Sequence, residues 1–199
     1  MIGNTRVVVA VTGASGIQYA QRLLQIIAEK GLEAHVVFSE PAFDVWRAEL
    51  DIPCDPAKPD LQAFAGTDGK FRLYRNTQVG APIASGSFRH RGMVICPCTM
   101  STLGRVANGT GDGLIGRAAE VTLKERRKLL IVPRETPLSL IALRNLVAVT
   151  EAGATVIDAN PGFYTRPQTV QDMIDFVVAR VLDHLEIDHA ITRRWGEKA

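Results

Sequence analysis

The sequence predicts a single α/β domain in which a parallel sheet carries helices on both faces. The chain has 199 residues, which is the length of one such domain. Short apolar runs alternate with longer stretches of helical period, and this alternation is the pattern of right-handed β-α-β crossovers. Hydrophobic residues at 46% and charged residues at 22% are the proportions of an ordinary globular protein. We expect the domain to cover residues 1–185 and a polar tail to cover residues 186–199.

The individual elements follow from the type and period of the apolar residues. Apolar runs, most of them rich in the β-branched residues that favour strands, are at Val7–Val11, Ala34–Phe38, Met93–Cys96, Leu129–Val132 and Ala154–Ile157. Stretches of helical period are at Ile17–Glu29, Pro41–Leu50, Thr99–Ala107, Leu138–Glu151 and Thr169–Leu185. Prolines and glycines interrupt residues 51–92, so we expect a surface excursion there, with one further strand near Phe71–Arg75.

The segments that directly follow the strands are expected to carry the function. Ligands of open parallel sheets bind outside the carboxyl ends of the strands. These segments read TGASG, SEPAF, CPCTMST, PRETP and DANPGFYTRP. At TGASG a buried strand runs into a helix, whose first amides lack partners and whose dipole is positive at this end. We therefore expect TGASG to hold an anion, such as the phosphate of a nucleotide.

Charge and hydropathy argue against two classes of partner. The net charge is +2, and no basic cluster is joined to an aromatic stripe, so nucleic acid is not expected. No apolar run reaches the roughly 18 residues of a membrane span. The first residues, MIGNTR, lead directly into a strand and leave no room for a signal sequence. We expect a cytoplasmic protein that does not enter a membrane.

The cysteines and histidines do not have the spacing of a metal site. Cys96 and Cys98 flank a proline, and with Cys54 they make an odd number of thiols, which we expect to be reduced. The four histidines show neither an HxxxH nor a CxxC partner pattern. We therefore expect no metal ion, and we interpret Cys96 and Cys98 as small residues near the end of the sheet.

TGASG is compatible with more than one nucleotide. A short-chain dehydrogenase has a third glycine where this chain has Tyr19, and it needs a tyrosine followed four residues later by lysine. None of the three tyrosines here has that lysine. A mononucleotide, with one phosphate and a flat ring, fits the short loop at least as well, and the dehydrogenase stays a minor alternative.

Hydroxyl side chains lie at several of the strand ends. Ser15 in TGASG and Ser39 after the second strand are either helix caps or donors to a ligand. After CPC, a run of hydroxyl residues that includes Thr99, Ser101 and Thr102 offers donors at a further helix N-terminus.

Charged residues at the later strand ends suggest anion chemistry. Arg134 and Glu135 follow a buried strand between two prolines, where the guanidinium can hold an anion and the carboxyl can move a proton if desolvation raises its pKa. By contrast, Arg117 and Lys124 belong to a charge run for which a solvated helix face is the simpler explanation.

A stiff loop near the end of the chain carries the last candidate. Tyr164 lies between two prolines and is followed by the helix that carries Arg180. A phenol and a guanidinium suit a small phosphate ester, and an ordinary surface loop is the alternative.

Taken in order, these segments resemble the flavin prenyltransferases of the UbiX/Pad type. The resemblance runs from Val7 to about Trp195 and is carried by TGASG, SGS at Ser85–Ser87, CPCT, RAAEVTLKERRKLLIVPRETPLS and PGFYTRPQT. It implies a Rossmann- or flavodoxin-like three-layer fold and a homo-oligomer, typically a dodecamer. It also implies an FMN-binding flavoprotein domain over residues 1–185, with residues 186–199 contributing to the active site or to oligomer contacts.

The activity implied by the resemblance is transfer of a dimethylallyl group. Members of the family use reduced FMN and dimethylallyl monophosphate without a metal ion, and join the prenyl group to N5 and then to C6 of the flavin. The product, prenylated FMN, serves a partner decarboxylase of the ubiquinone-biosynthesis or aromatic-acid type.

Matching positions imply roles for individual residues. Contacts to FMN are implied for Gly13, Ala14, Ser15, Ser39, Thr99, Met100, Ser101, Thr102 and Arg134. Contacts to the prenyl phosphate, some from neighbouring subunits, are implied for Arg117, Lys124, Tyr164 and Arg180. Catalytic roles are implied for Ser15 as a proton relay at N5, Glu49 as a carboxylate near the flavin, Glu135 as the proton donor or acceptor at the phosphate, and Trp195 as a pocket wall.

Two other functions share the implied fold. An FMN-dependent decarboxylase of the cysteine-decarboxylase type is expected to carry a catalytic histidine and a substrate clamp, which we do not find in the sequence. A non-catalytic FMN carrier needs no prenyl-phosphate site. Retention of Lys124, Glu135, Tyr164 and Arg180 favours the transferase.

Overall fold

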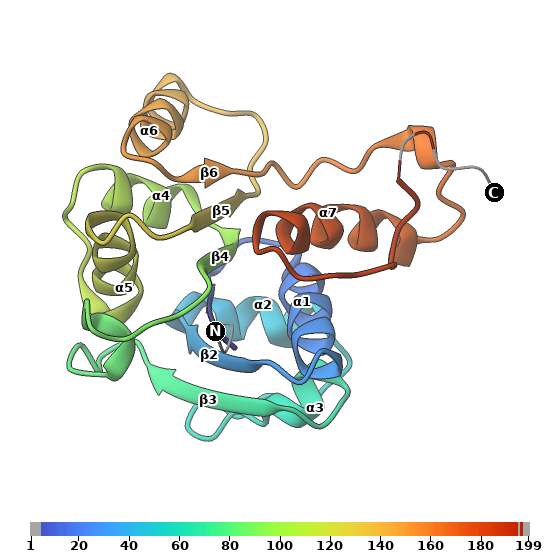
Figure 1. Ribbon diagram of the computed structural model, residues 1–199, viewed down its shortest axis with the longest axis horizontal. Helices are drawn as coiled ribbons and strands as arrows, with labels where there is room; N and C mark the ends of the chain where they lie inside the picture. The colour runs from blue at the N-terminus through green and yellow to red at the C-terminus, as the bar shows by residue number, and fades with distance from the viewer. Residues whose placement is uncertain (1–4, 195, 197–199) are drawn as a thin grey trace.

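One parallel sheet forms the centre of the molecule in the computed structural model, which describes residues 5–194 and 196 (Figure 1). Its six strands lie in the order β3-β2-β1-β4-β5-β6. They are β1 (Arg6–Val11), β2 (Glu33–Phe38), β3 (Lys70–Arg75), β4 (Met93–Cys98), β5 (Leu129–Pro133) and β6 (Thr155–Val156). This is the strand order of Rossmann sheets, in which successive strands are added on one side of β1 up to β3 and on its other side from β4 onward. The connections after β1 and β4 therefore diverge and leave a crevice at the carboxyl ends of these two strands.

Seven helices and two short 3₁₀ turns connect the strands within the described residues. The helices are α1 (Ile17–Glu29), α2 (Glu40–Glu49), α3 (Leu61–Ala65), α4 (Met100–Ala107), α5 (Gly113–Lys124), α6 (Leu140–Glu151) and α7 (Val170–His184). The turns are η1 (Pro82–Ala84) and η2 (Phe163–Thr165). No helix in this part of the chain combines the length and the apolar character that crossing a bilayer requires.

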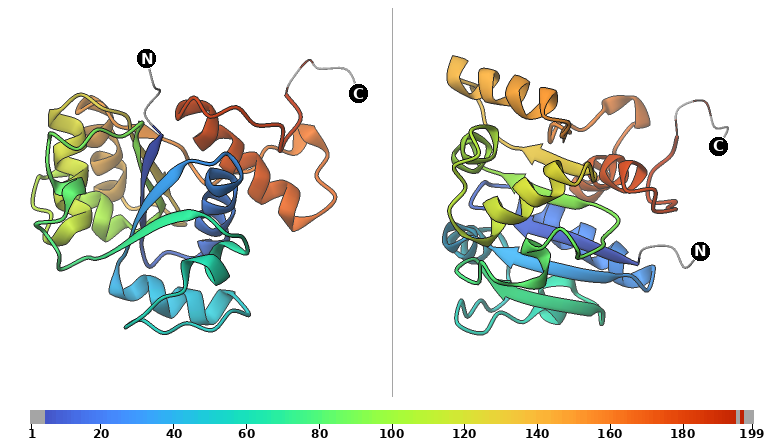
Figure 2. Two further views of the ribbon diagram at one scale, coloured as in Figure 1. Left: turned by 60° about the horizontal axis from the view of Figure 1, so that its bottom comes forward. Right: turned by 60° about the vertical axis from the view of Figure 1, so that its left-hand side comes forward.

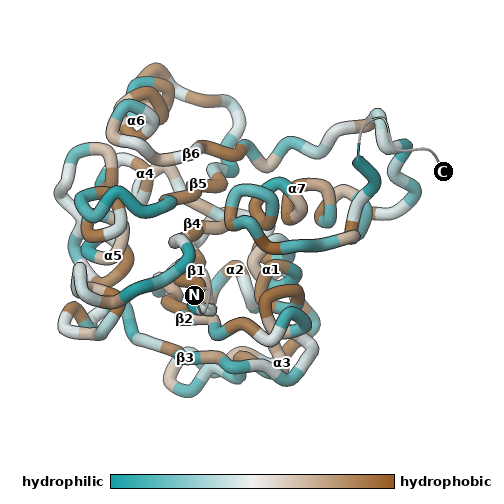
Figure 3. Tube along the Cα trace, in the orientation of Figure 1, coloured by the Kyte–Doolittle hydropathy of each residue, from teal (hydrophilic) through white to brown (hydrophobic). Residues whose placement is uncertain are grey.

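The two faces of the sheet are covered by different helices, as the alternation of side chains along a strand requires. In β1, Val7, Val9 and Val11 belong to the core beneath α1, α2, α3 and α7. Val8 and Ala10 belong to the core beneath α4, α5 and α6. Figure 2 shows these helices on opposite sides of the sheet, and Figure 3 shows apolar residues along the strands between them. The predicted three-layer α/β fold is confirmed.

Most elements predicted from the sequence are confirmed. Two helices, α3 and α5, were not predicted, and residues 51–92 are more buried than expected. All five predicted strands are present, although the last is shorter, and the further strand near Phe71–Arg75 is the edge strand β3. The excursion over residues 51–92 is less superficial than expected, because α3 buries Leu61 and Phe64 beneath α1 and α2. Helix α5 was not predicted, because its last turn merges with the charge run that precedes β5.

The loop ahead of β4 buries a histidine. His90 is 6% exposed, and its ring stacks at 6.1 Å from the ring of Phe88. Burial away from water is the main reason that its pKa falls from 6.5 to about 4, and the positive charge of Arg127 also lowers it. The ring is therefore neutral in the folded protein at pH 7.

We expect the folded protein to lose stability as the pH falls from 6.5 to about 4, the pKa values of the unfolded and folded imidazole. Above this window the folded and unfolded chains both carry a neutral ring, and below it both carry a charged one. Across the whole window, His90 accounts for a loss of about 3 kcal/mol in the free energy of unfolding. Urea unfolding at pH 7.5 and 4.5 should show a smaller loss for His90→Gln than for wild type. Equal losses would contradict this account.

Candidate active site

Three strand-end segments meet at the carboxyl edge of the sheet, at the crevice between β1 and β4. Thr12, directly after β1, donates its hydroxyl to the Pro97 carbonyl at 2.8 Å and accepts the Thr99 amide at 2.9 Å. Arg134, directly after β5, donates Nε to the Ser15 carbonyl at 3.1 Å. The expectation that TGASG, CPCTMST and PRETP lie together is confirmed. No role was predicted for Thr12, although its place at the start of TGASG, directly after a buried strand, is a signal that could have indicated one.

The start of α1 is capped from within the chain. Gly16 is the N-cap with φ of 100°, a conformation that glycine adopts without strain. The Glu49 carboxylate accepts the amides of Gly16 at 2.9 Å and Ile17 at 3.2 Å. Ser15 makes no side-chain cap, so that interpretation was wrong. The amides of the N-cap and of the first residue of α1, which were expected to face an external anion, bind this carboxylate instead.

Replacing Glu49 with Ala should lower the free energy of unfolding of the ligand-free protein by about 1 kcal/mol. The change leaves two amides of α1 without their acceptor and removes a negative charge from the positive end of the helix. Urea unfolding measures the loss, and Glu29→Ala, at the exposed C-terminal end of the same helix, is the matched control. A loss no larger than that of the control would contradict the capping role.

A buried hydroxyl without a partner lies beside TGASG. Gly13 has no room for a Cβ, because Pro41 of α2 occupies that space, so the loop after β1 packs directly on the start of α2. Ser39, the N-cap of α2, donates its amide to the Val11 carbonyl at 2.9 Å. Its Oγ is buried and has no hydrogen-bond partner among the described residues. Such a group costs free energy unless a water or ligand satisfies it, which fits a bound nucleotide at this edge.

Helix α4 presents its N-terminus to the same crevice. Thr99 is the N-cap, and its Oγ1 accepts the Thr102 amide at 3.1 Å and donates to Thr102 Oγ1 at 3.0 Å. Met100 and Ser101 form the first turn, in which the Ser101 side chain is exposed. Helix N-termini favour anions because their first amides point outward. This end therefore supplies the polar donors that the sequence suggested.

Arg134 and Glu135 lie on a pocket of about 380 Å³ between the loops that follow β5 and β6. The bond from Arg134 to Ser15 connects this pocket to TGASG. Glu135 is exposed, and its Oε1 accepts the amide of Thr136 at 3.0 Å. The carboxylate is thus held at the rim, next to a half-buried guanidinium. This arrangement can bind an anion and exchange a proton with it.

Lys124 lies at the opposite edge of the sheet. It is the last residue of α5 and precedes β5, whereas Arg134 follows β5. Five strand residues at roughly 3.3 Å each separate the two edges by about 16 Å. Lys124 Nζ pairs with Glu125 Oε1 at 2.8 Å and lies against Gly86 in the SGS segment. One chain therefore does not bring Lys124 to the Arg134 pocket.

The other residues implied for the prenyl phosphate are also dispersed. Arg180 is in the last turns of α7, whose end meets the amino edge of the sheet through the bond from Lys128 Nζ to the His184 carbonyl at 2.9 Å. Tyr164, in η2, packs edge to face on Phe176. Figure 1 shows α5 and α7 on different sides of the sheet.

Two further predicted residues complete the set. Arg117 is within α5, where it pairs with Glu120 at 3.1 Å. Trp195 lies outside the described residues.

The two thiols near the crevice are buried and protonated. Burial raises the pKa of Cys98 to about 12 and raises that of Cys96 further, so neither is a nucleophile at neutral pH. All three cysteines are free, as expected. Within the described ranges, no three His, Cys, Asp or Glu side chains cluster in a way that could hold a metal ion.

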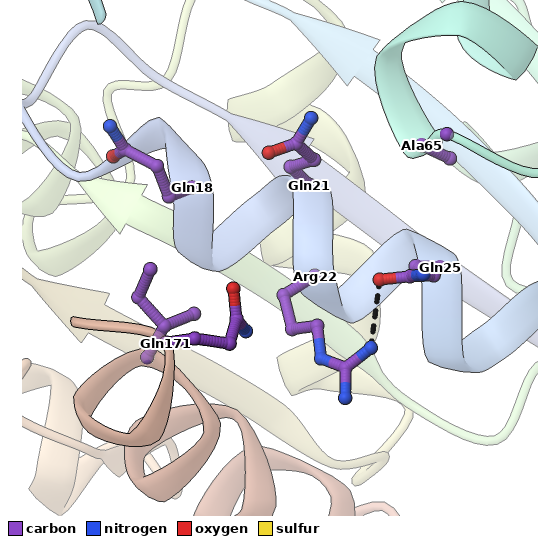
Figure 4. Close-up of a pocket in the computed structure, with 8 residues that line it drawn as sticks. Gln18, Gln21, Arg22, Gln25, Ala65 and Gln171 are labelled. Atoms are coloured by element: carbon purple, nitrogen blue, oxygen red, sulfur yellow. Dashed lines mark hydrogen bonds between the residues drawn. The ribbon is translucent and has the colours of Figure 1, made fainter. Parts of the chain in front are cut away.

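A separate pocket of about 260 Å³ between α1, α3 and α7 is lined largely by amide side chains (Figure 4). Arg22 donates to Gln25 Oε1 at 2.8 Å and to Asp175 Oδ1 at 2.7 Å, and Gln171 donates to the same Asp175 atom at 2.8 Å. Gln21 donates to the Phe64 carbonyl at 2.8 Å. Because these polar groups satisfy one another, the pocket is a packing seam between helices.

Known proteins are similar to this chain over nearly its whole length. A family model described as Flavoprotein matches residues 1–182. The flavin prenyltransferase UbiX of Halalkalibacterium halodurans is 47% identical over 191 residues, which cover 96% of this chain and 93% of the relative. The flavin prenyltransferase UbiX of Pseudomonas aeruginosa is 45% identical over 204 residues, which cover 100% of this chain and 97% of the relative.

Solved structures extend the similarity to three dimensions. The crystal structure of AnUbiX (PadA1) in complex with FMN and dimethylallyl pyrophosphate has a TM-score of 0.88 and 39% identity, and the match covers 98% of each chain. A dodecameric FMN-dependent UbiX-like decarboxylase from Escherichia coli has a TM-score of 0.86 and 40% identity, over 96% of this chain and 100% of that one. The chain belongs to the flavin prenyltransferase family of flavoproteins.

Proposed function

We propose that this flavin prenyltransferase uses its carboxyl-edge site to join the dimethylallyl group of dimethylallyl monophosphate to N5 and C6 of reduced FMN. The observation that carries the proposal is the buried, unpartnered Ser39 hydroxyl next to TGASG, together with the Arg134–Ser15 link that places Glu135 on the rim of the same crevice. A nucleotide satisfies the hydroxyl, and a reacting phosphate suits the arginine and carboxylate.

The chain holds FMN through the donors at four strand ends. The TGASG residues Gly13, Ala14 and Ser15 line one side, and Ser39 donates its free hydroxyl. The first turn of α4, from Thr99 to Thr102 with Met100 and Ser101, lines the opposite side. The guanidinium of Arg134 adds a positive charge next to Ser15. Reduced flavin supplies the nucleophilic N5 and C6 positions, so no base-activated protein nucleophile is needed.

The protein's part in the reaction is to stabilise separating charges. Breaking the allylic C–O bond leaves an allyl cation and a phosphate anion. Lys124, Arg180 and Arg117 neutralise the phosphate, and the phenol of Tyr164 donates to it. Trp195 presents an aromatic face to the cation.

Protons are handled by three groups at the carboxyl edge. Glu135 donates a proton to the departing phosphate or accepts one from it, which its place on the pocket rim allows. Ser15 relays a proton at N5. Glu49 is proposed as a further carboxylate near the flavin. It is held there because it accepts hydrogen bonds from the amides at the start of α1.

The complete site needs more than one copy of the chain. FMN donors lie at the carboxyl edge, whereas Lys124 and the end of α7 lie at the amino edge, so one chain does not surround the prenyl phosphate. We propose a homo-oligomer in which a neighbour supplies these residues, with the dodecamer of the similar E. coli protein as its expected form. Residues 186–199 are proposed to contribute to the site or to subunit contacts.

The product is prenylated FMN, which a partner decarboxylase of the ubiquinone-biosynthesis or aromatic-acid type is proposed to use. The donor is proposed to be the monophosphate, and the protein is proposed to act in the cytoplasm. A direct competition between the monophosphate and the diphosphate donors, followed by the rate of flavin modification, tests the donor preference.

The function is tested by incubating the protein anaerobically with reduced FMN and dimethylallyl monophosphate and weighing the extracted flavin by mass spectrometry. We expect a flavin heavier by one prenyl unit, and unmodified FMN when the prenyl phosphate is left out. Tightly bound but unmodified FMN in the complete reaction, under conditions where an authentic transferase works, would favour a carrier or decarboxylase.

A further inference from the structure

The SGS segment, Ser85–Ser87, is a motif without a role in the proposed reaction. It follows η1 directly, and the side chains of Ser85 and Ser87 are exposed. The two hydroxyls lie 2.9 Å apart, and the Phe88 amide donates to the Ser85 carbonyl at 3.1 Å, so the segment is a tight turn. We call it the SGS turn. The carbonyls of Gly86 and Phe88 accept hydrogen bonds from a distant part of the chain.

Arg127 holds the SGS turn from beyond the end of α5. Its Nη1 donates to the Phe88 carbonyl at 2.8 Å, and its Nη2 donates to the Gly86 carbonyl. Only 19% of the Arg127 side chain is exposed, so water competes little for these bonds. A guanidinium presents its donors in a rigid planar fork, whereas a lysine ammonium is a point charge on a flexible stem. Arginine is therefore suited to fix two carbonyls that lie two residues apart.

The backbone at the end of α5 aims Arg127 at the turn. Helix α5 ends at Lys124, and Arg126 adopts the left-handed conformation with φ of 55°. The Arg126 amide donates to the Leu123 carbonyl at 2.9 Å. The Arg127 amide donates to the Thr122 carbonyl, also at 2.9 Å. These bonds close the helix, so Lys124 and Arg127 belong to one fixed helix end.

The SGS turn lies directly against the Lys124–Glu125 pair. Lys124 Nζ is 2.8 Å from Glu125 Oε1, and Glu125 Oε2 is 3.9 Å from Arg127 Nη2, so the carboxylate lies between the two cations. A Cβ on Gly86 would overlap the Glu125 carboxylate and lie 3.3 Å from Lys124 Nζ. Glycine is therefore needed for this close approach. The backbone that Arg127 holds is the wall against which the Lys124 ammonium rests.

We propose that Arg127 is a positioning residue for prenyl transfer: by holding the SGS turn against the Lys124–Glu125 pair, it fixes the Lys124 ammonium where the phosphate of the dimethylallyl donor binds. The proposal rests on the proposed function, in which Lys124 neutralises that phosphate for a neighbouring chain. The Lys124 side chain is half exposed, and a lysine loses much conformational freedom when it is held in one geometry. Ordering the side chain before the phosphate arrives therefore tightens binding.

The effect of Arg127 is confined to the donor. The FMN donors lie at the carboxyl edge of the sheet, whereas α5 ends at the amino edge, a strand's length away. Loss of the Arg127 fork is therefore expected to weaken binding of the prenyl phosphate while FMN affinity stays unchanged. A general loss of folding would lower both affinities.

The test compares Arg127→Lys with Arg126→Lys. Both changes keep the charge and a long side chain at the same helix end, and Arg126 is exposed. Calorimetric titration measures the Kd of dimethylallyl monophosphate for the oligomer loaded with oxidised FMN, because transfer needs the reduced flavin. We expect this Kd to rise about tenfold in Arg127→Lys and to stay within about twofold of wild type in Arg126→Lys. FMN affinity should match wild type in both variants.

Steady-state transfer with reduced FMN separates positioning from a purely structural effect. We expect KM for the donor to rise about tenfold in Arg127→Lys while kcat changes by less than about threefold, because the phosphate is an anion before and after the bond breaks. An unchanged Kd in Arg127→Lys would overturn the proposal, as would an equal loss of FMN affinity. Wild-type protein that leaves reduced FMN unmodified would instead refute the proposed function, since the Kd comparison needs no transfer.

A second pair of variants leaves Arg127 in place. Gly86→Ala puts a methyl group into the space of the Glu125 carboxylate, whereas a Cβ at Gly80, in the same loop, meets no atom within 4 Å. We expect Gly86→Ala to weaken donor binding about as much as Arg127→Lys does, and Gly80→Ala to leave it unchanged. Wild-type donor binding in Gly86→Ala would overturn the proposal, because the SGS turn would then have no part in placing Lys124.

Discussion

Replacing Glu135 with Gln is expected to slow prenyl transfer by about 100- to 10,000-fold while FMN binding stays near wild type. The amide keeps the size of the side chain but exchanges no proton at neutral pH, so the phosphate loses its proton donor or acceptor. FMN affinity is preserved because the donors to the nucleotide come from TGASG, Ser39, Arg134 and the start of α4.

Single-turnover reactions with reduced FMN, sampled by mass spectrometry of the flavin, measure the rate of transfer, and fluorescence titration measures FMN affinity. Glu29→Gln is the matched control, because Glu29 is an exposed glutamate at the end of α1. Transfer at the wild-type rate in Glu135→Gln would remove this carboxyl from the mechanism. A large loss of FMN binding would show that it holds the nucleotide instead.

Two inactive variants are expected to restore activity when they are assembled together. Lys124→Ala removes a cation for the phosphate, and Glu135→Gln removes the proton donor, so each homo-oligomer should be nearly inactive. If every site takes Lys124 from one chain and Glu135 from another, random mixing of equal amounts leaves about one quarter of the sites with both native side chains. We expect two different chains to supply these residues because, within one chain, Lys124 precedes β5 and Glu135 follows it, so they lie at opposite edges of the sheet.

The mixture is made by dissociating and reassembling the two variants, or by expressing them together, and its prenyl transfer is compared with that of each variant alone. A mixture of either variant with itself, treated in the same way, controls for the procedure. No recovery in a mixed oligomer of confirmed composition would mean that Lys124 and Glu135 act from the same chain, and would contradict the proposed division of the site.

The fold was largely predictable because its main signals are local. The apolar runs at β1 and β4 are continuous, which is the pattern of strands buried on both faces, and α1 and α7 have a regular helical period. Helix α5 was missed because its charged end obscured that period. The short helix α3 was missed because it has only five residues between proline- and glycine-rich segments, which are too few to show a helical period.

The candidate site was only partly predictable, because hydrogen bonds between distant segments leave no periodic signal. Ser15 and Ser39 were given the same alternatives, cap or ligand donor. Neither side chain caps its helix: Glu49, more than thirty residues away in sequence, caps α1, while the Ser39 hydroxyl is buried and unpartnered among the described residues. The role of Thr12 as the link between two loops was invisible for the same reason.

By itself, the sequence determined which segments end strands and therefore which loops, TGASG, CPCTMST and PRETP among them, share one edge of the sheet. Residue order and apolar period suffice for this, because parallel strands all end on the same side. Only the tertiary structure decided that Glu49 occupies the start of α1, that Lys124 lies a strand's length from Arg134, and that Arg127 binds the SGS turn. These features depend on how elements distant in sequence pack together, and local residue patterns carry no information about that packing.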